Sequence, residues 1–245
     1  MPLKALRATL RKRTGGPDLV AAAIRQQIVD GELPAGKKLP DERSFAAQLG
    51  VARVTVRTAL TLLQGEGLLE RTQGRGTIVR PFLVSGGPNL LTPLLNQSQG
   101  IPELQAVASE FLAVRRHIAG AVLERIPVPF SPKDAAPLRQ AIEVLEAAIA
   151  EDAERELIVA ADLLVAQALI ASSQSPILQL IFNPISSTLR EHPHLAAALY
   201  QRPAENLRAW HAMLKWCQGR SRDTTSILDA MRLRDETTLK RMRAI

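Results

Sequence analysis

Two arginines four residues apart, Arg53 and Arg57, with Thr55 between them, are side chains suited to contacting nucleic acid. Guanidinium groups bond guanine O6 and N7 or phosphate oxygens, and a hydroxyl can bond a phosphate or a base edge. In a helix, we expect the three to share the face opposite the apolar side chains, with the first turn entering the major groove. The alternative is a solvated amphipathic helix.

The surrounding segments predict the elements that would present this helix. Apolar spacing predicts one helix over residues 17 to 30 and a second over 41 to 49, with acidic residues in the first turn of the second. Gly50, which tolerates a positive φ, separates the second helix from a third over 52 to 66. The core positions of the third helix are Val56, Leu60 and Leu63. Two short helices joined at a glycine predict a helix-turn-helix.

A β-hairpin is predicted after the third helix. Two β-rich runs, 68 to 72 and 77 to 80, flank the turn Gln73-Gly-Arg-Gly76. This turn lacks the Lys-Ser/Thr and the strand-to-helix context of a nucleotide-binding loop. We therefore interpret it as the tip of a wing, where Arg75 can reach a phosphate or the minor groove; a bare turn is the alternative. Three helices plus a hairpin form a winged helix.

The charge distribution supports a polyanionic partner. Residues 1 to 81 hold fourteen Lys and Arg against seven acids, whereas the remaining 17 basic and 17 acidic residues cancel over 82 to 245. The whole net charge of +7 therefore lies in the first third of the chain. Such a localised excess is typical of a surface that replaces counterions on phosphates.

The rest of the chain is predicted to be helical. Residues 82 to 100 form a linker with a short helix near 89 to 95, and residues 101 to 245 form an all-helical bundle. The predicted fold is thus mostly α, with a winged helix-turn-helix domain over 1 to 81. No apolar run is long enough to span a membrane and no signal peptide is evident, so we expect a cytoplasmic protein without membrane contact.

The N-terminal motifs resemble the GntR family of bacterial transcription regulators. The likeness lies in Leu39-Pro-Asp-Glu-Arg43, Leu49-Gly-Val-Ala-Arg53, Thr55-Val-Arg57 and Gln73-Gly-Arg-Gly-Thr-Ile-Val79. It implies DNA contacts from the second helix, the third helix and the wing. The residues it assigns to DNA are Arg43, Arg53, Thr55, Arg57, Gln73, Gly74 and Arg75.

The helical segment resembles the effector domain of the FadR subfamily, called the FCD domain. The match of Leu112-Ala-Val-Arg115 implies that Arg115 faces a ligand cavity. Many members hold a divalent metal with one Asp and three His, and the equivalent positions here are Asp162, Ala166, His211 and Arg234. Two ligands out of four hold a metal poorly and a guanidinium repels it, so we expect no metal and no cofactor. Loss of the metal set is also a feature of the fatty-acyl-responsive FadR type.

The cavity is therefore expected to bind a small organic anion, an acyl-CoA or a carboxylate, with Arg115 as its anionic anchor and with Asp162, His211 and Arg234 as the other effector-binding residues. An apolar-tailed anion such as an acyl-CoA is favoured over a small sugar acid. The expected apolar lining is Leu163, Leu164, Leu169 and Ile181. A buried guanidinium needs a partner. The alternative is a structural pair between Arg115 and Asp162 that ties two helices together.

These observations predict a ligand-responsive regulator, such as a repressor, that binds a palindromic double-stranded operator as a homodimer. An enzyme is disfavoured, because four histidines and one cysteine form no recognisable triad. His192 and His194 are expected at the surface. Two alternatives remain: an architectural or constitutive DNA-binding protein whose helical domain only dimerises, and a metal-dependent carboxylate sensor.

Overall fold

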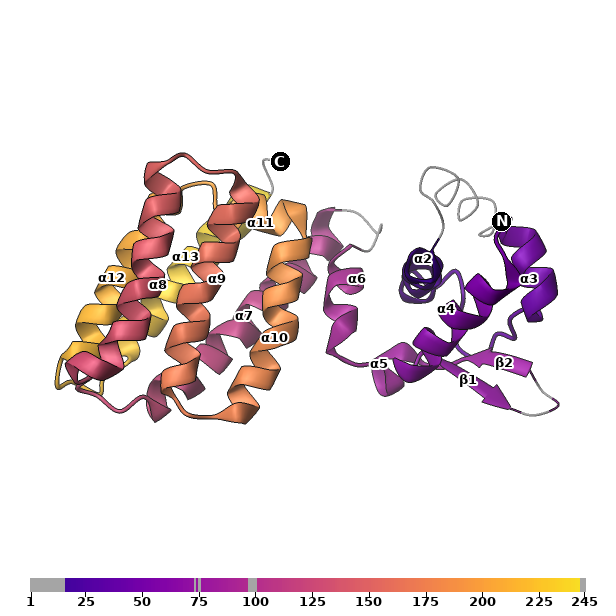
Figure 1. Ribbon diagram of the computed structural model, residues 1–245, viewed down its shortest axis with the longest axis horizontal. Coiled ribbons are helices and arrows are strands. Elements are labelled where there is room, and N and C mark those ends of the chain that lie inside the picture. The colour runs from indigo at the N-terminus through magenta and orange to yellow at the C-terminus, as the bar shows by residue number, and fades with distance from the viewer. Residues whose placement is uncertain (1–15, 73, 75, 97–100, 243–245) are drawn as a thin grey trace. The chain divides into compact units, whose positions relative to one another are not determined.

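A computed structural model of the chain describes residues 16–72, 74, 76–96 and 101–242, with only the backbone for 101–103. The chain divides into two compact units, Met1–Gly100 and Ile101–Ile245, which are taken separately below (Figure 1). Within the described residues, none of the helices combines the length and apolar content needed to cross a bilayer.

The first unit has the expected winged-helix elements. Its helices are α2 (Pro17–Val29), α3 (Glu42–Leu49) and α4 (Arg53–Gly65). The hairpin is made of β1 (Leu69–Thr72) and β2 (Gly76–Val79), which pair antiparallel from Leu69 opposite Val79 to Thr72 opposite Gly76. The predicted elements are confirmed, and their bounds shift by only one or two residues.

Local capping sets the limits of α3. Asp41, expected inside the helix, is its N-cap, and its carboxylate accepts hydrogen bonds from the amides of Arg43 and Ser44, both at 3.0 Å. Bonds from the Ser44 amide and hydroxyl lower the pKa of Asp41. Gly50 ends the helix with a φ of 71°, a conformation that a side chain disfavours. This cap and this glycine fix the turn before α4.

The core of the first unit lies between α2, α3, α4 and the hairpin. The three predicted core positions of α4 are buried, with exposed fractions of 0% for Val56, 6% for Leu60 and 0% for Leu63. Arg25 of α2 also donates from Nε to Glu66 at 2.7 Å, which joins α2 to the end of α4. Helix α4 is thus held along its inner face and at its C-terminal end.

The segment after the wing packs on the first unit. It forms α5 (Phe82–Ser85), a short 3₁₀ helix (Pro88–Leu90) and α6 (Leu91–Leu95). Gln26 of α2 donates to the carbonyl of Pro93 at 3.2 Å, and Leu90 joins the apolar core of the unit. Apolar side chains in this segment therefore extend the winged-helix unit beyond residue 81.

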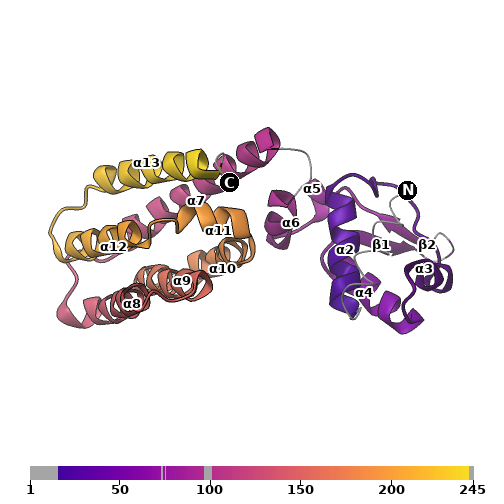
Figure 2. The ribbon, with the colours of Figure 1, turned by 90° about the horizontal axis from the view of Figure 1, so that it is seen from above.

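The second unit is all-helical in the residues that the structure describes. Its helices are α7 (Ile101–Arg125), α8 (Pro132–Ala150), α9 (Arg155–Ser172), α10 (Pro176–Glu191), α11 (Pro193–Leu199), α12 (Pro203–Gln218) and α13 (Thr225–Met242). Figure 2 shows α12 between α13 and α8. α9 packs beside α8, and α10 packs on α9. The predicted mostly α fold is confirmed.

Proline and capping side chains mark where these helices begin. Pro132, Pro176, Pro193 and Pro203 each occupy the first helical position, where a missing amide costs no hydrogen bond. His192 caps α11, because its Nδ1 accepts a hydrogen bond from the Leu195 amide at 3.0 Å. His192 is therefore buried, and the expectation that it lies at the surface was wrong. His194 is exposed.

Candidate functional site

The outer face of α4 carries the first candidate site. Arg53 and Arg57 are exposed, whereas Thr55 is half-buried. Because a helix turns by about 100° per residue, Thr55 lies well away from both arginines around the axis. The position opposite the core is Val54, whose side chain is 56% exposed. We did not single out Val54 from the sequence, although the same spacing argument would have found it.

A groove lies between the start of α3, the start of α4 and the hairpin. Predicted DNA-contacting residues Arg43, Arg53 and Gly74 line it, together with two cations absent from the prediction, Lys38 and Arg71. Arg71 belongs to β1, so the alternation of that strand could have indicated it. The predicted contacts Gln73 and Arg75 lie outside the described residues. The groove brings cations from four segments to one surface.

Glu42 partly neutralises two of the arginines that line this groove. Glu42 accepts hydrogen bonds from Nε of Arg53 at 3.2 Å and from an Nη of Arg71 at 3.4 Å. Both arginine side chains are about two-thirds exposed, at 67% and 66%. Arg57 forms no ion pair with any residue that the structure describes. Arg57 therefore presents its full charge, and Arg53 and Arg71 are partly neutralised.

The base of the wing is fixed to the segment before α3. Lys38 and Ile78 form a β-bridge, and the amide of Leu39 donates to the carbonyl of Thr77 at 2.9 Å. Gly76 has a φ of 88°, and a Cβ there would lie 2.9 Å from Cε of Lys38. The glycine thus lets the lysine side chain cross the hairpin closely, which keeps this cation at the groove.

The second candidate site is a cavity of about 120 Å³ inside the helical unit. Side chains from α7, α9, α10, α12 and α13 line it, together with Tyr200. Its apolar lining includes Ile118, Val122, Leu123, Leu163, Leu169, Phe182, Ile185, Leu189 and Met213. Its polar lining is Arg115, Asp162, Tyr200, Trp210 and Arg234.

Asp162 is held by two neutral donors. Its two carboxylate oxygens accept hydrogen bonds from the Tyr200 hydroxyl at 2.8 Å and from the indole Nε1 of Trp210 at 2.6 Å. Asp162 is only 5% exposed. Burial, and then the nearby Asp162 charge, raise the pKa of Tyr200 well above its ordinary value. Tyr200 therefore keeps its proton and remains a donor.

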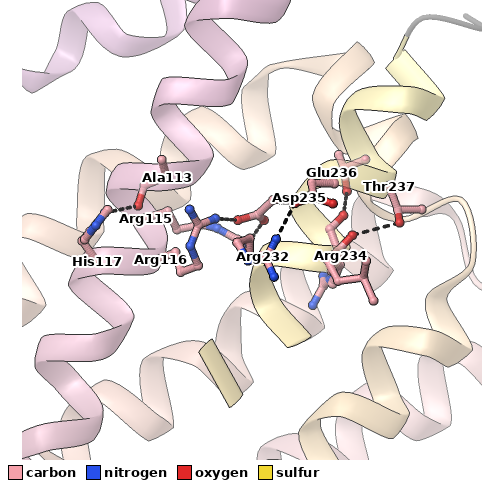
Figure 3. Close-up of polar contacts among 11 residues, drawn as sticks. Ala113, Arg115, Arg116, His117, Arg232, Arg234, Asp235, Glu236 and Thr237 are labelled. Carbon is pink, nitrogen blue, oxygen red and sulfur yellow. Dashed lines mark hydrogen bonds and ion pairs between the residues drawn. The ribbon is translucent and has the colours of Figure 1, made fainter. Parts of the chain in front are cut away.

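Arg115 is paired with Asp235 and not with Asp162. Arg115 of α7 donates to one oxygen of Asp235 on α13 at 2.7 Å, and Arg116 donates to the other oxygen (Figure 3). The alternative of an Arg115–Asp162 pair was therefore wrong. Asp162 is already bonded by Tyr200 and Trp210, while Asp235 meets two guanidinium groups and is 3% exposed. This triad joins the first and last helices of the unit.

Arg234 lies next to this triad on α13 and lines the cavity (Figure 3). Its Nε is buried without a hydrogen-bond partner, and so is the Nε of Arg115. Among the described residues, no ion pair includes Arg234. Burial lowers the pKa of the Arg234 guanidinium, and the charge of Asp162 opposes that shift. The cavity thus contains a guanidinium whose hydrogen-bonding capacity is not fully used.

The structure brings three of the four predicted effector residues together. Arg115, Asp162 and Arg234 line the cavity, whereas His211 is exposed on α12 and does not. The residue before it, Trp210, faces the cavity instead. Of the predicted apolar lining, Leu163 and Leu169 are present, but Leu164 and Ile181 are 48% and 43% exposed and were wrongly assigned.

The residues present do not fit a divalent metal. Both oxygens of Asp162 accept hydrogen bonds, Ala166 offers no donor atom, and Arg234 brings a positive charge to the position of a ligand. Within the part of the chain that the structure describes, no three His, Cys, Asp or Glu side chains gather in a metal-binding arrangement.

A winged helix followed by an all-helical unit with a cavity is the architecture of a DNA-binding transcription regulator. The model of the gntR family of bacterial regulatory proteins matches residues 18–79, and the model of the FCD domain matches residues 110–232. The chain therefore belongs to the GntR family of bacterial regulatory proteins and carries an FCD domain.

Similar proteins are transcription regulators. The chain is 29% identical over 181 residues to the uncharacterized HTH-type regulator Rv0494 of Mycobacterium tuberculosis, covering 74% of this chain and 71% of that one. It is 52% identical over 56 residues to the HTH-type transcriptional repressor NagR of Bacillus subtilis, which covers 23% of each. The fold is similar to that of Lar, which controls the Listeria monocytogenes agr system, with a TM-score of 0.56, 13% identity and 93% of each chain covered.

Proposed function

We propose that the chain is a ligand-responsive regulator that binds a palindromic operator as a homodimer in the cytoplasm and changes its DNA affinity when a small organic anion binds the FCD cavity. The observation that carries the proposal is that cavity, because apolar walls and unused guanidinium donors together suit an organic anion. A ligand that prefers one of two conformational states shifts the population toward that state.

On the DNA side, the proposed contacts are Arg43, Arg53, Thr55, Arg57, Gln73, Gly74 and Arg75. Exposure of the arginines of α4 and the cationic groove beside them support these contacts. The test is to select an operator from random duplex DNA and to measure affinity for the Arg53→Ala, Arg57→Ala double variant. Unchanged operator affinity would show that α4 is not the helix that reads the operator.

The wing has a test of its own. Arg75→Ala should lower the affinity for many DNA sequences alike if Arg75 contacts a phosphate. It should instead alter the preference for A·T-rich flanking sequence if Arg75 enters the minor groove.

A charge-free surface on α9 and α10 supports the homodimer. From Leu157 to Leu189 the only charged residue is Asp162, which is buried. The exposed apolar side chains on these two helices are Leu157, Leu164, Ile177, Leu180 and Ile181. Such a surface can meet its own copy without like-charge repulsion, as a twofold interface requires.

The oligomeric state tests this surface. Sedimentation should give a dimer for the parent chain and a monomer for the Leu164→Glu, Leu180→Glu double variant. The control is Leu233→Glu, because Leu233 is also exposed, at 63%, but lies on α13. If the double variant is still a dimer, the surface of α9 and α10 is not the dimer interface.

An architectural or constitutive DNA-binding protein is the second candidate, since the Arg115–Asp235–Arg116 triad already ties α7 to α13 without a ligand. A sensor should gain melting temperature with its effector and change operator affinity, whereas the architectural protein should do neither. Mass spectrometry of small molecules released from denatured protein supplies the first candidates.

We infer that the chain is not an enzyme. Its family consists of transcription regulators, and burial raises the pKa of the Cys217 thiol to about 12, which leaves it protonated and a poor nucleophile. A hydrolytic or transfer activity lost on changing Cys217 to Ala would overturn this inference.

A further inference from the structure

We propose that the FCD cavity binds a single compact monocarboxylate, with a body about the size of a benzene ring, and that Arg234 is the residue that anchors its carboxylate. This inference rests on the proposed function, because it takes the cavity to be the effector site. It goes further by assigning the ligand's charge, size and anchoring residue.

The charge of the ligand follows from the groups gathered at the cavity. Arg115, Arg234 and Asp162 line the cavity. Asp235 and Arg116 do not line it, but Asp235 pairs with both Arg115 and Arg116 directly beside it. The cluster therefore carries one surplus positive charge, and one carboxylate neutralises it. A dianion would leave an unpaired negative charge beside the buried Asp162, which is costly in a low-dielectric site.

Arg234 is the guanidinium available for this anchoring role. Arg115 and Arg116 are already ion-paired with Asp235, at 2.7 Å for Arg115. Arg234 has no ion-pair partner among the described residues, and its buried Nε has no acceptor. A carboxylate can accept two parallel hydrogen bonds from one guanidinium. Binding would therefore supply the counter-charge that Arg234 lacks among the described residues.

The volume of the cavity limits the rest of the ligand. About 120 Å³ is close to the roughly 150 Å³ of an engineered protein cavity that holds benzene. The walls opposite the polar groups are apolar, with Phe182, Ile185 and Leu189 contributed by α10. A ring or a short branched chain fits this space. A long acyl chain does not, so the ligand class is narrower than the acyl-CoA or carboxylate expected from the sequence.

The experiment is calorimetric titration of the full-length chain with benzoate, the compact monocarboxylate used as the probe. Benzamide tests the need for charge, phthalate tests the limit to one charge, and palmitoyl-CoA tests the limit of size. Arg234→Met keeps the length and apolar stem of the side chain but removes its charge. Arg232→Met is the matched control, because Arg232 is two residues away on α13 and its side chain is 56% exposed.

We expect benzoate to bind the parent chain and the Arg232→Met variant equally well. Arg234→Met should weaken binding by about 30-fold or more, the size expected for the loss of a charge-assisted pair of hydrogen bonds, and Arg234→Lys should restore part of it. Circular dichroism and melting temperature of each variant establish that it is folded. Benzamide, phthalate and palmitoyl-CoA should bind more weakly than benzoate.

Two results separate the failure of this inference from the failure of the proposed function. If phthalate or palmitoyl-CoA binds more tightly than benzoate and releases the operator, the chain is a ligand-responsive regulator but the inferred ligand class is wrong. Equal binding of benzoate to the parent and to folded Arg234→Met would also overturn the anchoring role. If none of the four compounds and no cell extract changes operator affinity or melting temperature, both proposals fail.

Discussion

The arginines of the groove beside α4 and those of the Arg115–Asp235–Arg116 triad lie in opposite electrostatic environments. On α4 and β1 they are exposed to water, and their only carboxylate partner in the described residues, Glu42, bonds them at 3.2 and 3.4 Å. In the helical unit, Arg115 and Arg116 are 15% and 21% exposed and share a carboxylate that is nearly buried. Because water screens the exposed ion pairs, they contribute little to the free energy of unfolding. Removing the carboxylate of the buried pairs would lower that free energy strongly.

This contrast explains how one chain uses the same side chain for two purposes. Exposed arginines that contribute little to stability remain free to exchange water and counterions for phosphates. A buried arginine is stabilised by a counter-charge, so the Arg234 guanidinium, which has no ion-pair partner among the described residues, favours the anion that we propose. The exposed set can therefore be changed with little effect on folding, and most of the buried set cannot.

The largest expected effect is on the buried triad. Asp235→Asn removes the counter-charge of both Arg115 and Arg116 and should lower the free energy of unfolding by about 3 kcal/mol. Chemical denaturation followed by tryptophan fluorescence measures this, because Trp210 and Trp216 both belong to the helical unit. Asp229→Asn is the control, since Asp229 lies on the same helix with a 62% exposed side chain. Equal free energies of unfolding for Asp235→Asn and Asp229→Asn would contradict the greater importance of the buried ion pairs for stability.

The next effect is on operator binding through Arg57. Arg57→Ala should weaken specific binding by about 1 to 3 kcal/mol, because Arg57 presents a charge without an internal partner. Its unfolding curve should coincide with that of the parent. Arg139→Ala, an exposed arginine of α8, loses the same charge and should leave operator affinity unchanged. If both variants lose the same affinity, net charge alone explains the effect.

A smaller effect is expected at Val54, which faces away from the core of its unit. An exposed apolar side chain on the recognition helix suits the methyl group of thymine, with a contribution of about 1 kcal/mol. Replacing single thymines of the operator with uracil should lower the operator affinity of the parent chain at one position. At that position the same replacement should leave the affinity of the Val54→Ala variant unchanged. Leu62→Ala, at a 39% exposed position of the same helix, is the control. Additive losses at every thymine would exclude the contact.

The smallest effect is expected at Glu42. Glu42→Gln frees Arg53 and Arg71, so affinity for any duplex should rise a few-fold and depend more steeply on salt. Stability should change by less than about 1 kcal/mol, because both arginine side chains are about two-thirds exposed, although the Glu42 side chain is only 14% exposed. Glu70→Gln removes an exposed carboxylate from β1 and is the matched control. An equal rise in DNA affinity for Glu42→Gln and Glu70→Gln would show that Glu42 does not selectively neutralise the two arginines.

The winged helix could be predicted from the sequence because its determinants are local. Apolar spacing gave α2, α3 and α4, Gly50 marked the turn, and the hairpin followed from two β-rich runs around glycines. The cationic groove was predicted in part. Lys38 and Arg71 were missed because their place depends on how the hairpin packs on the segment before α3.

The cavity could be predicted only through family resemblance. Its partners are far apart in the sequence: 120 residues separate Arg115 from Asp235, and 48 separate Asp162 from Trp210. Helical periodicity says which side of a helix is apolar but not which helix faces it. That is why Arg115 was matched with the wrong aspartate. His211 was assigned through the family resemblance, and the residue that lines the cavity is its neighbour Trp210.

The hydrogen bond between Trp210 and Asp162 gives the protein an optical readout of its own cavity. The chain has two tryptophans, and the indole of the other, Trp216, donates instead to the carbonyl of Asp223 at 3.0 Å. If an anion binds Arg234 as we propose, it should change the electric field around Trp210, which lines the same cavity, more than the field around Trp216, which does not line it. The emission of a Trp216→Phe variant would therefore follow occupancy directly, without a label, on the timescale of binding.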